Sequence, residues 1–301
     1  MLRRVVSRVV VVGILLAVSG PWARPRVSAQ AGARERTLFV TVTDRAGEPV
    51  DTLVPSDLTV REDGVSREVL RVSRATEPLD IAILVDNAAS SSDLIPRVRE
   101  GLKAFVATMA PQHAIALIGL ADRPTILVDY TNDQKKLLEG INRLFTQSRS
   151  GMTLLDGVSE IAAGLSKRDA ARTAIVPIVT DGTEFTTRHY RDVLDSVSKS
   201  GAALYPITIG RFALTDDDAI RDRTLLLDAG PTVSGGRRFS LLSSNAVELT
   251  LSRLARQLNA QFKVVYGRPE TLIPPEKVEV STTKTGFSAT GTPLRTARTG
   301  A

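Results

Sequence analysis

Two acidic residues each follow a short apolar run, and their positions suggest a ligand-binding edge. Asp86 ends the run at residues 81–85 and precedes small residues that include Ser90. Asp181 ends a second run, at residues 174–180. Apolar runs of this length are typical of strands buried on both faces of a parallel sheet, and ligands bind beyond the carboxyl ends of such strands. We therefore expect Asp86 and Ser90 to lie where a ligand binds.

The residues around Asp86 resemble the metal-ion-dependent adhesion site of the von Willebrand factor type A domain. The family pattern is an Asp-x-Ser-x-Ser loop after the first strand, followed later in the chain by a Thr and an Asp. In this sequence residues 86–90 read Asp-Asn-Ala-Ala-Ser, and the resemblance assigns the later positions to Thr153 and Asp181. The resemblance covers roughly residues 37–290. More specifically, the chain is similar to secreted bacterial proteins in which a signal peptide and a short β segment precede the domain.

The resemblance implies a divalent cation, Mg²⁺ or alternatively Mn²⁺ or Ca²⁺, at Asp86, Ser90, Thr153 and Asp181. A hard cation such as Mg²⁺ prefers six oxygen ligands at about 2.0–2.1 Å and keeps several waters, which suits carboxylates and hydroxyls. In the family, an acidic side chain of a partner protein completes the coordination. A site of this kind binds a partner and supplies no base or nucleophile for catalysis.

One position departs from the family pattern, because Ala88 stands where a Ser ligand is expected. A water could replace the missing hydroxyl, since Mg²⁺ accepts water ligands. Alternatively, the site has lost its metal and keeps only its shape. Asp86 and Asp181 could also act separately, each as a cap of the turn or helix that follows it.

Apolar runs and helical repeats alternate from residue 80 to residue 259, which predicts a doubly wound, Rossmann-like α/β fold. Its sheet would be mostly parallel, with helices on both faces. The expected helices cover residues 94–109, 133–145, 154–165, 189–199, a short stretch after 216–218, and 246–258. Residues 91–93 and Asn245 are expected to cap the first and the last of them. Pro177 conflicts with a central strand, because proline has no backbone N–H for the ladder.

Both flanks of this α/β core have β character. Residues 34–76 contain Asp63-Gly64, a strong hairpin signal that predicts a strand returning over residues 65–72. Further strands are expected within residues 261–292. A β unit this small is not stable alone, so we expect the two flanks to pair into one antiparallel subdomain beside a type A domain at residues 79–260. Residues 293–301 are expected to be disordered.

Residues 1–29 have the pattern of a secretory signal peptide, with arginines, then an apolar stretch, then small residues before a cleavage point after Ala29. An uncleaved membrane anchor is the alternative, although the apolar stretch is shorter than the roughly 18–20 residues of a spanning helix. The sequence therefore predicts export to the periplasm or the extracellular space, without a stable membrane span after cleavage. The chain has no cysteine, so disulfides and thiolate chemistry are excluded.

The charge and the histidine content exclude two further classes of protein. The formal net charge is +6, but residues 1–29 hold five arginines and no acid, so the rest of the chain carries only +1 and lacks the basic surface of a nucleic-acid-binding protein. Two histidines and no Gly-x-Ser-x-Gly turn give no support for a hydrolase. The sequence thus predicts an exported, non-enzymatic module that binds another protein. The alternative is a metal-free structural or assembly domain of a cell-envelope complex.

Overall fold

A computed structural model describes residues 33–212, 214–269, 273, 275 and 277–293. The predicted signal peptide, and the predicted tail beyond Pro293, lie outside the described residues. Within them, no helix is both long enough and apolar enough to cross a membrane.

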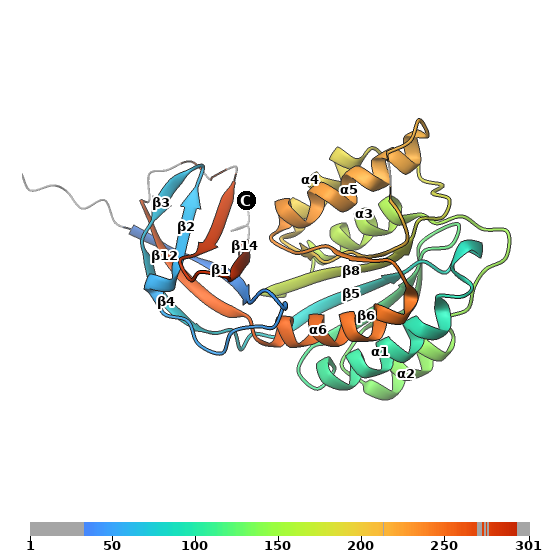
Figure 1. Cartoon of the computed structure of the whole chain (residues 1–301), viewed down its shortest axis with the longest axis horizontal. Coiled ribbons are helices and arrows are strands. Elements are labelled where there is room, and N and C mark those ends of the chain that lie inside the picture. The colour runs from blue at the N-terminus through green and yellow to red at the C-terminus, as the bar shows by residue number, and fades with distance from the viewer. Residues whose placement is uncertain (1–32, 213, 270–272, 274, 276, 294–301) are drawn as a thin grey trace, which may run out of the picture. The chain divides into compact units, whose positions relative to one another are not determined.

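The central element is a mixed sheet in which β5 is flanked by β8 and β6 (Figure 1). The strand order is β11-β10-β8-β5-β6-β7, and β9 also pairs with β8. All neighbouring pairs are parallel except β6 with β7, which is antiparallel. The strands are β5 Leu79–Val85, β6 Ala114–Gly119, β7 Thr125–Thr131, β8 Arg172–Thr180, β9 Ala203–Leu204, β10 Ile207–Ile209 and β11 Phe239–Leu241. The predicted mostly parallel sheet is confirmed.

Helices cover both faces of this sheet (Figure 1). On one face lie α1 Ile95–Met109, α2 Gln134–Asn142 and α6 Val247–Asn259. On the other face lie α3 Leu154–Leu165, α4 Tyr190–Ser200 and α5 Asp218–Ser234. This doubly wound arrangement also agrees with the prediction.

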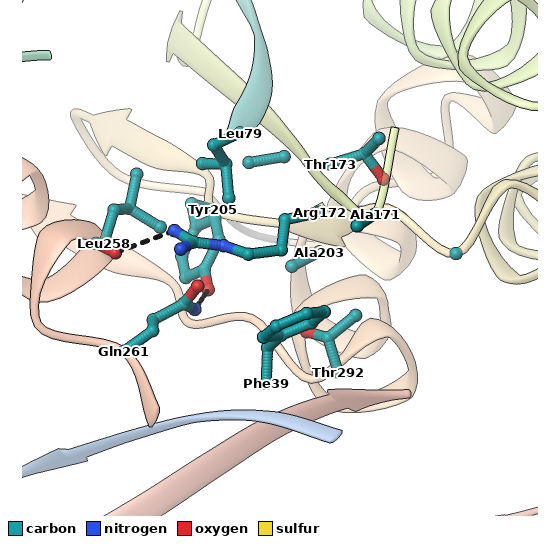
Figure 2. A pocket seen from close by; sticks show the side chains of 12 residues that line it. Phe39, Leu79, Ala171, Arg172, Thr173, Ala203, Tyr205, Leu258, Gln261 and Thr292 are labelled. Atoms are coloured by element: carbon teal, nitrogen blue, oxygen red, sulfur yellow. Dashed lines mark hydrogen bonds between the residues drawn. The ribbon is translucent and has the colours of Figure 1, made fainter. Parts of the chain in front are cut away.

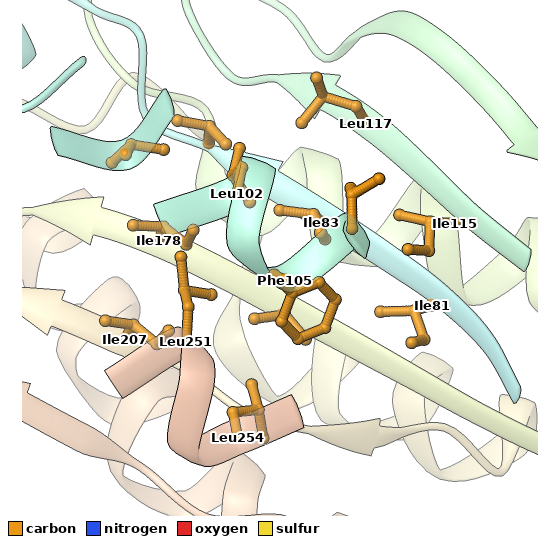
Figure 3. Close-up of a cluster of buried hydrophobic side chains, with 14 of the residues drawn as sticks. Ile81, Ile83, Leu102, Phe105, Ile115, Leu117, Ile178, Ile207, Leu251 and Leu254 are labelled. Carbon is orange, nitrogen blue, oxygen red and sulfur yellow. The ribbon is translucent and has the colours of Figure 1, made fainter. Parts of the chain in front are cut away.

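Alternate residues of β5 enter the two halves of the core. Ile81 and Ile83 pack with side chains of α1 and α6, as Figure 3 shows around Phe105. Ala82 and Leu84 pack on the opposite face with side chains of α3. Because a strand buried on both faces exposes no polar face, β5 forms a continuous apolar run that ends only at Asp86.

The two flanks of the chain pair with each other, as predicted. One sheet has the order β14-β1-β12-β4 and the other the order β13-β2-β3. The strands are β1 Ala33–Thr43, β2 Leu58–Glu62, β3 Val65–Arg67, β4 Val69–Arg74, β12 Phe262–Pro269, β13 Val278–Thr282 and β14 Ser288–Pro293. Both sheets contribute to one apolar cluster, which includes Val40, Val60 and Val264. We call these two sheets the β unit.

The hairpin turn has the predicted geometry, but its returning strand does not run as one piece. Asp63 and Gly64 have φ angles of 48° and 81°, as a type I′ turn requires. The returning chain breaks at Glu68, so that β3 pairs with β2 whereas β4 pairs with β12. Periodicity could not predict this change of partner.

Helix starts differ from the sequence predictions at both ends of the α/β core. The N-cap residue of α1 is Leu94, without a side-chain hydrogen bond, and the hydroxyl of Ser91 instead donates to the Ala88 carbonyl. The N-cap of α6 is Ala246 rather than Asn245. In both places a short 3₁₀ turn precedes the helix and satisfies backbone groups that a capping side chain would otherwise bind.

Two predicted helix lengths were wrong. The helix after residues 216–218 is not short, because α5 has 17 residues and continues through Pro231. It ends where Gly235 adopts a left-handed φ of 74°, which is the stronger stop signal. Conversely, α2 ends at Asn142, which leaves Phe145 in the following loop.

Pro177 fits the central strand β8 because the neighbouring strand of the sheet is interrupted beside this residue. Tyr205 donates its backbone N–H to the carbonyl of Ile175, so Ile175 and, two residues on, Pro177 face the β9–β10 side of β8. On that side β9 ends at Leu204 and β10 begins at Ile207. The missing N–H of Pro177 therefore faces a gap in the ladder, and the strand predicted at residues 202–209 is two short strands.

Candidate functional site

The candidate site lies at the carboxyl ends of β5, β6 and β8, which are neighbours in the sheet. Residues 147–154, which we call the crossing segment, connect the three loops that follow these strands. The crossing segment forms backbone hydrogen bonds with Asn87 after β5, with Leu120 and Asp122 after β6, and with Thr183 after β8. It therefore fixes these loops relative to one another.

Asp86 is fully buried, and its carboxylate is held from both sides. Its Oδ1 accepts the backbone N–H of Ala88 at 2.9 Å. Its Oδ2 accepts the hydroxyl and the backbone N–H of Thr180, the last residue of β8. These donors stabilise a charged carboxylate inside the protein.

Ser90 lies next to Thr180, with 3.4 Å between their hydroxyl oxygens. The Thr180 hydroxyl uses its hydrogen to donate to Asp86. In the contact between Thr180 and Ser90, Ser90 must therefore be the donor. The lone pairs of Ser90 then remain available for a ligand. Gly182 allows this approach, since a Cβ there would come within 2.1 Å of the Ser90 hydroxyl oxygen.

Thr153, the N-cap residue of α3, presents its hydroxyl in the same way. Its hydroxyl donates to the backbone carbonyl of Leu120 at 2.9 Å, and its backbone N–H bonds to the same carbonyl. The hydroxyl hydrogen is thus used inside the protein, which leaves the lone pairs of the oxygen for a ligand.

Asp181 is exposed, and its carboxylate is directed toward the loop after β10. Its Oδ2 accepts the backbone N–H of Arg211 at 2.9 Å. Gly210 has a φ of 112°, and a Cβ there would lie 2.5 Å from the Asp181 carboxyl carbon. In the described residues, no hydrogen bond joins any two of the side chains of Asp86, Ser90, Thr153 and Asp181.

Two neighbouring ionisable residues were not identified from the sequence. Glu184 is buried, accepts the backbone N–H of Leu154 through Oε1, and burial raises its pKa to about 8. Arg223, on α5, is 1% exposed and donates to the carbonyl of Gly182. Burial lowers the pKa of Arg223, while the nearby carboxylates, among them Glu184, Asp181 and Asp86, act in the opposite direction. Arg223 is therefore a buried cation beside the candidate site.

Asn87 and Thr180 were also missed, although both adjoin predicted site residues. The side chain of Asn87 accepts the N–H of Ala121 and donates to the carbonyl of Phe145, so it holds two loops together. Their positions beside Asp86 and Asp181 were a signal that could have found them. Arg223 offered no such signal, because it is distant in the sequence and meets the site only through folding.

The donor chemistry at this edge fits a hard divalent cation. Asp86 and Asp181 could supply charge, and Ser90 and Thr153 hydroxyl lone pairs, all of them oxygen ligands. The described residues contain no group of three or more His, Cys, Asp or Glu side chains suited to a metal, so such a site would depend on its hydroxyls. Ala88, where the family pattern has Ser, is 1% exposed and packs within the apolar cluster on the α3 face of the sheet.

Large apolar side chains are exposed on the loops at the same edge. Phe145 follows α2, Phe185 follows β8, Leu214 follows β10 and Leu242 follows β11. Their exposed fractions are 62%, 56%, 63% and 89%. Arg99 places its guanidinium 4.4 Å from the centre of the Phe145 ring. We call these four residues the apolar rim.

The family of the α/β core follows from a comparison with known protein families. Residues 81–184 match the family model of the von Willebrand factor type A domain. The chain contains a von Willebrand factor type A domain, and all four candidate ligands lie within the matched residues. A comparison with curated proteins gave no match.

Several solved structures align with the chain at low sequence identity. A von Willebrand factor type A protein from Catenulispora acidiphila aligns with a TM-score of 0.49 and 9% identity, over 90% of this chain and 68% of that chain. The von Willebrand factor domain of the type V pili tip protein Mfa5 from Porphyromonas gingivalis aligns with a TM-score of 0.48 and 12% identity, over 62% and 96%. The PilB minor pilin from Streptococcus sanguinis aligns with a TM-score of 0.45 and 12% identity, over 62% and 63%.

Proposed function

We propose that this chain is an exported protein-binding module that engages its partner with the loops at the carboxyl edge of the sheet. A divalent cation of the Mg²⁺ type would be held there by Asp86, Ser90, Thr153 and Asp181. A carboxylate of the partner would complete its coordination. The module has no catalytic role in this proposal, and export rests on the signal-like residues 1–29.

The observation that carries the proposal is the apolar rim on the same edge as the oxygen ligands. Exposed apolar side chains gathered on one surface mark interaction sites, and aromatic residues are enriched at protein interfaces. Phe145 and Phe185 are fixed by neighbouring loops, since Asn87 binds the Phe145 carbonyl and the Phe185 N–H bonds to Met152. Anchors held in this way lose little conformational entropy when a partner binds.

A metal-free version of the same module is favoured by two observations. Arg223 already supplies a buried positive charge beside Asp86 and Asp181. Ala88 removes one hydroxyl ligand and fills its place with an apolar contact. In this version, packing surfaces alone make the contacts of a structural or assembly domain in a cell-envelope complex.

The partner-binding surface can be tested with three variants of similar side-chain exposure. Phe145→Ser and Phe185→Ser alter the apolar rim, whereas Val65→Ser alters a side chain on β3, in the β unit, that is 55% exposed. Proteins retained from an envelope extract by the unaltered chain should be lost with the two rim variants and kept with Val65→Ser. Equal retention by all three variants would refute the proposed surface.

Calorimetric titration with Mg²⁺ and Mn²⁺ separates the two versions. If the cation is part of the site, the unaltered chain binds it, Ala88→Ser binds it more tightly, and chelator releases the retained proteins. If the site has lost its metal, the unaltered chain gives no binding heat and chelator leaves retention unchanged. Binding heat that appears only in Ala88→Ser would show that the unaltered chain binds no metal because the hydroxyl is missing. Binding heat that appears only in Arg223→Met would show that the buried guanidinium prevents metal binding.

A further inference from the structure

A cavity of about 210 Å³ lies where the β unit meets the type A domain. Thr41 and Thr43 of β1 and Ser288 and Thr290 of β14 line it from the β unit. Tyr205 between β9 and β10, Arg237 before β11, and Gln257 of α6 line it from the type A domain. Each of these seven lining residues carries a hydrogen-bonding group in its side chain.

The four hydroxyls from the β unit form a two-by-two array on one face of a sheet. Thr41 pairs with Thr290 and Thr43 pairs with Ser288 in the antiparallel ladder. Residues two apart on a strand point to the same face, so these four side chains point together. The residues of β1 on the opposite face, Leu38, Val40 and Val42, form the core of the β unit.

Among the described residues that line the cavity, Arg237 is the only charged one. It donates to the Thr43 hydroxyl at 3.2 Å, and no ion pair in the described residues includes it. Its neighbour Arg238, by contrast, is paired with Asp228. An exposed guanidinium without a carboxylate partner, beside hydroxyls, is suited to bind a carboxylate or a phosphate.

The inner wall of the cavity is rigid. Tyr205 and Gln257 are each 3% exposed, and the Gln257 amide donates to the Gly47 carbonyl at 2.7 Å. Tyr205 also lines a second cavity, of about 10 Å³, together with Arg172, which donates to the Leu258 carbonyl (Figure 2). That volume is sufficient for about one water, so of these two cavities between described residues only the larger can take a ligand.

We propose that the larger cavity binds a small anionic polyol of about hexose size. Its carboxylate or phosphate would pair with Arg237, and its hydroxyls would bond to Thr41, Thr43, Ser288 and Thr290. The volume lies below the roughly 300 Å³ of a drug-sized site but exceeds the space needed for a few waters. Neutral or cationic ligands would leave the guanidinium unpaired. The site is separate from the proposed partner-binding edge, because Leu79 and Arg172, the first residues of β5 and β8, line the adjoining small cavity.

Four probes identify the ligand chemistry in calorimetric or NMR titrations of the full chain. They are D-glucuronate, D-glucose 6-phosphate, D-glucose and inorganic phosphate. We expect one of the two anionic sugars to bind with a Kd on the order of 1 mM or tighter, as its number of atoms allows. Preference for glucuronate identifies a sugar acid as the ligand class, and preference for glucose 6-phosphate a sugar phosphate. Glucose alone should bind at least tenfold more weakly.

Two pairs of variants test whether the anionic sugar binds in this cavity. Arg237→Gln should weaken the anionic sugar at least tenfold, whereas Arg191→Gln, on the surface of α4, should not change it. Thr43→Val should weaken it severalfold, whereas Thr59→Val, on β2, should not. The proposal is overturned if neither anionic sugar binds, if phosphate binds as tightly as the sugars, or if Arg237→Gln binds like the unaltered chain. Thermal unfolding of each variant confirms that a loss of binding is not a loss of folding.

Discussion

Thr180 donates its hydroxyl to Oδ2 of Asp86, so that the last residue of β8 holds the carboxylate that follows β5. The Asp86 backbone N–H in turn bonds to the carbonyl of Ile178. The two central strands are therefore connected beyond the end of their regular ladder, at the point where the candidate ligands gather. The contacts that stabilise the fold here would therefore also shape the proposed ligand site.

Thr180→Val should destabilise the protein by about 1–3 kcal/mol, because it leaves the buried carboxylate of Asp86 without its hydroxyl donor. The free energy of unfolding in denaturant measures the loss. Thr173→Val, near the other end of β8 and away from Asp86, should cost less. Equal costs for the two variants would contradict the role given to the Thr180–Asp86 contact.

Gly210→Ala should cost about 1–3 kcal/mol and displace Asp181, since the residue has a φ of 112° and its new Cβ would collide with that carboxylate. Denaturant unfolding measures the loss of stability, and titration with Mg²⁺ measures the change in affinity for the proposed cation. Gly164→Ala is the control, because a Cβ at this α3 position meets nothing within 4 Å. It should stabilise the protein by about 0.5–1 kcal/mol.

Glu184 should make stability fall as the pH rises from about 4.5 to about 8. Burial raises its pKa from 4.5 to about 8, so across this window the folded chain keeps a proton that the unfolded chain releases. The contribution is complete below the lower value and lost above the upper one, with a slope of up to about 1.4 kcal/mol per pH unit. The free energy of unfolding, measured between pH 5 and 8, should fall with this slope in the unaltered chain and in Glu160→Gln. In Glu184→Gln the slope should be absent.

Gly235→Ala should disturb the contact between α5 and β14. A Cβ at Gly235 would lie 1.8 Å from the Gly291 carbonyl oxygen, and its φ of 74° adds strain. Gly64→Ala is matched for strain, with a φ of 81°, but its Cβ would meet nothing. We expect Gly64→Ala to cost about 1–2 kcal/mol and Gly235→Ala clearly more. Similar costs would show that β14 moves aside without penalty.

The sequence was sufficient to predict those parts of the fold that depend on local pattern. Alternating apolar runs and helical repeats predicted the doubly wound core, and the instability of small β units predicted that the two flanks pair. The errors arose where the partner of a segment decides its structure. Pro177 is tolerated because β9 and β10 are interrupted beside it, and nothing in the local sequence of β8 reports that gap.

The candidate site likewise contains residues that local pattern could predict and residues that it could not. Asp86 could be placed at the carboxyl edge of the sheet from its position after an apolar run, and its role as a metal ligand stays a prediction. Glu184 and Arg223 could not be connected to that edge, since they approach it from a loop and a distant helix. The positive charge of Arg223 would oppose a bound cation, whereas Glu184 keeps its proton up to about pH 8, so the ligand pattern alone was not enough to judge the site.

The position of β1 between β12 and β14 has a consequence for folding kinetics. Phe39 pairs with Lys263 on one side and with Thr292 on the other. A strand near the start of the chain can therefore pair only after segments near its end have been synthesised. Pairings this distant in sequence form slowly, and a strand with two unpaired edges readily associates with other chains. A chain that stopped after α6 would hold a complete sheet in its type A domain and still expose β1. Resistance to aggregation is therefore acquired only when the last strand is in place.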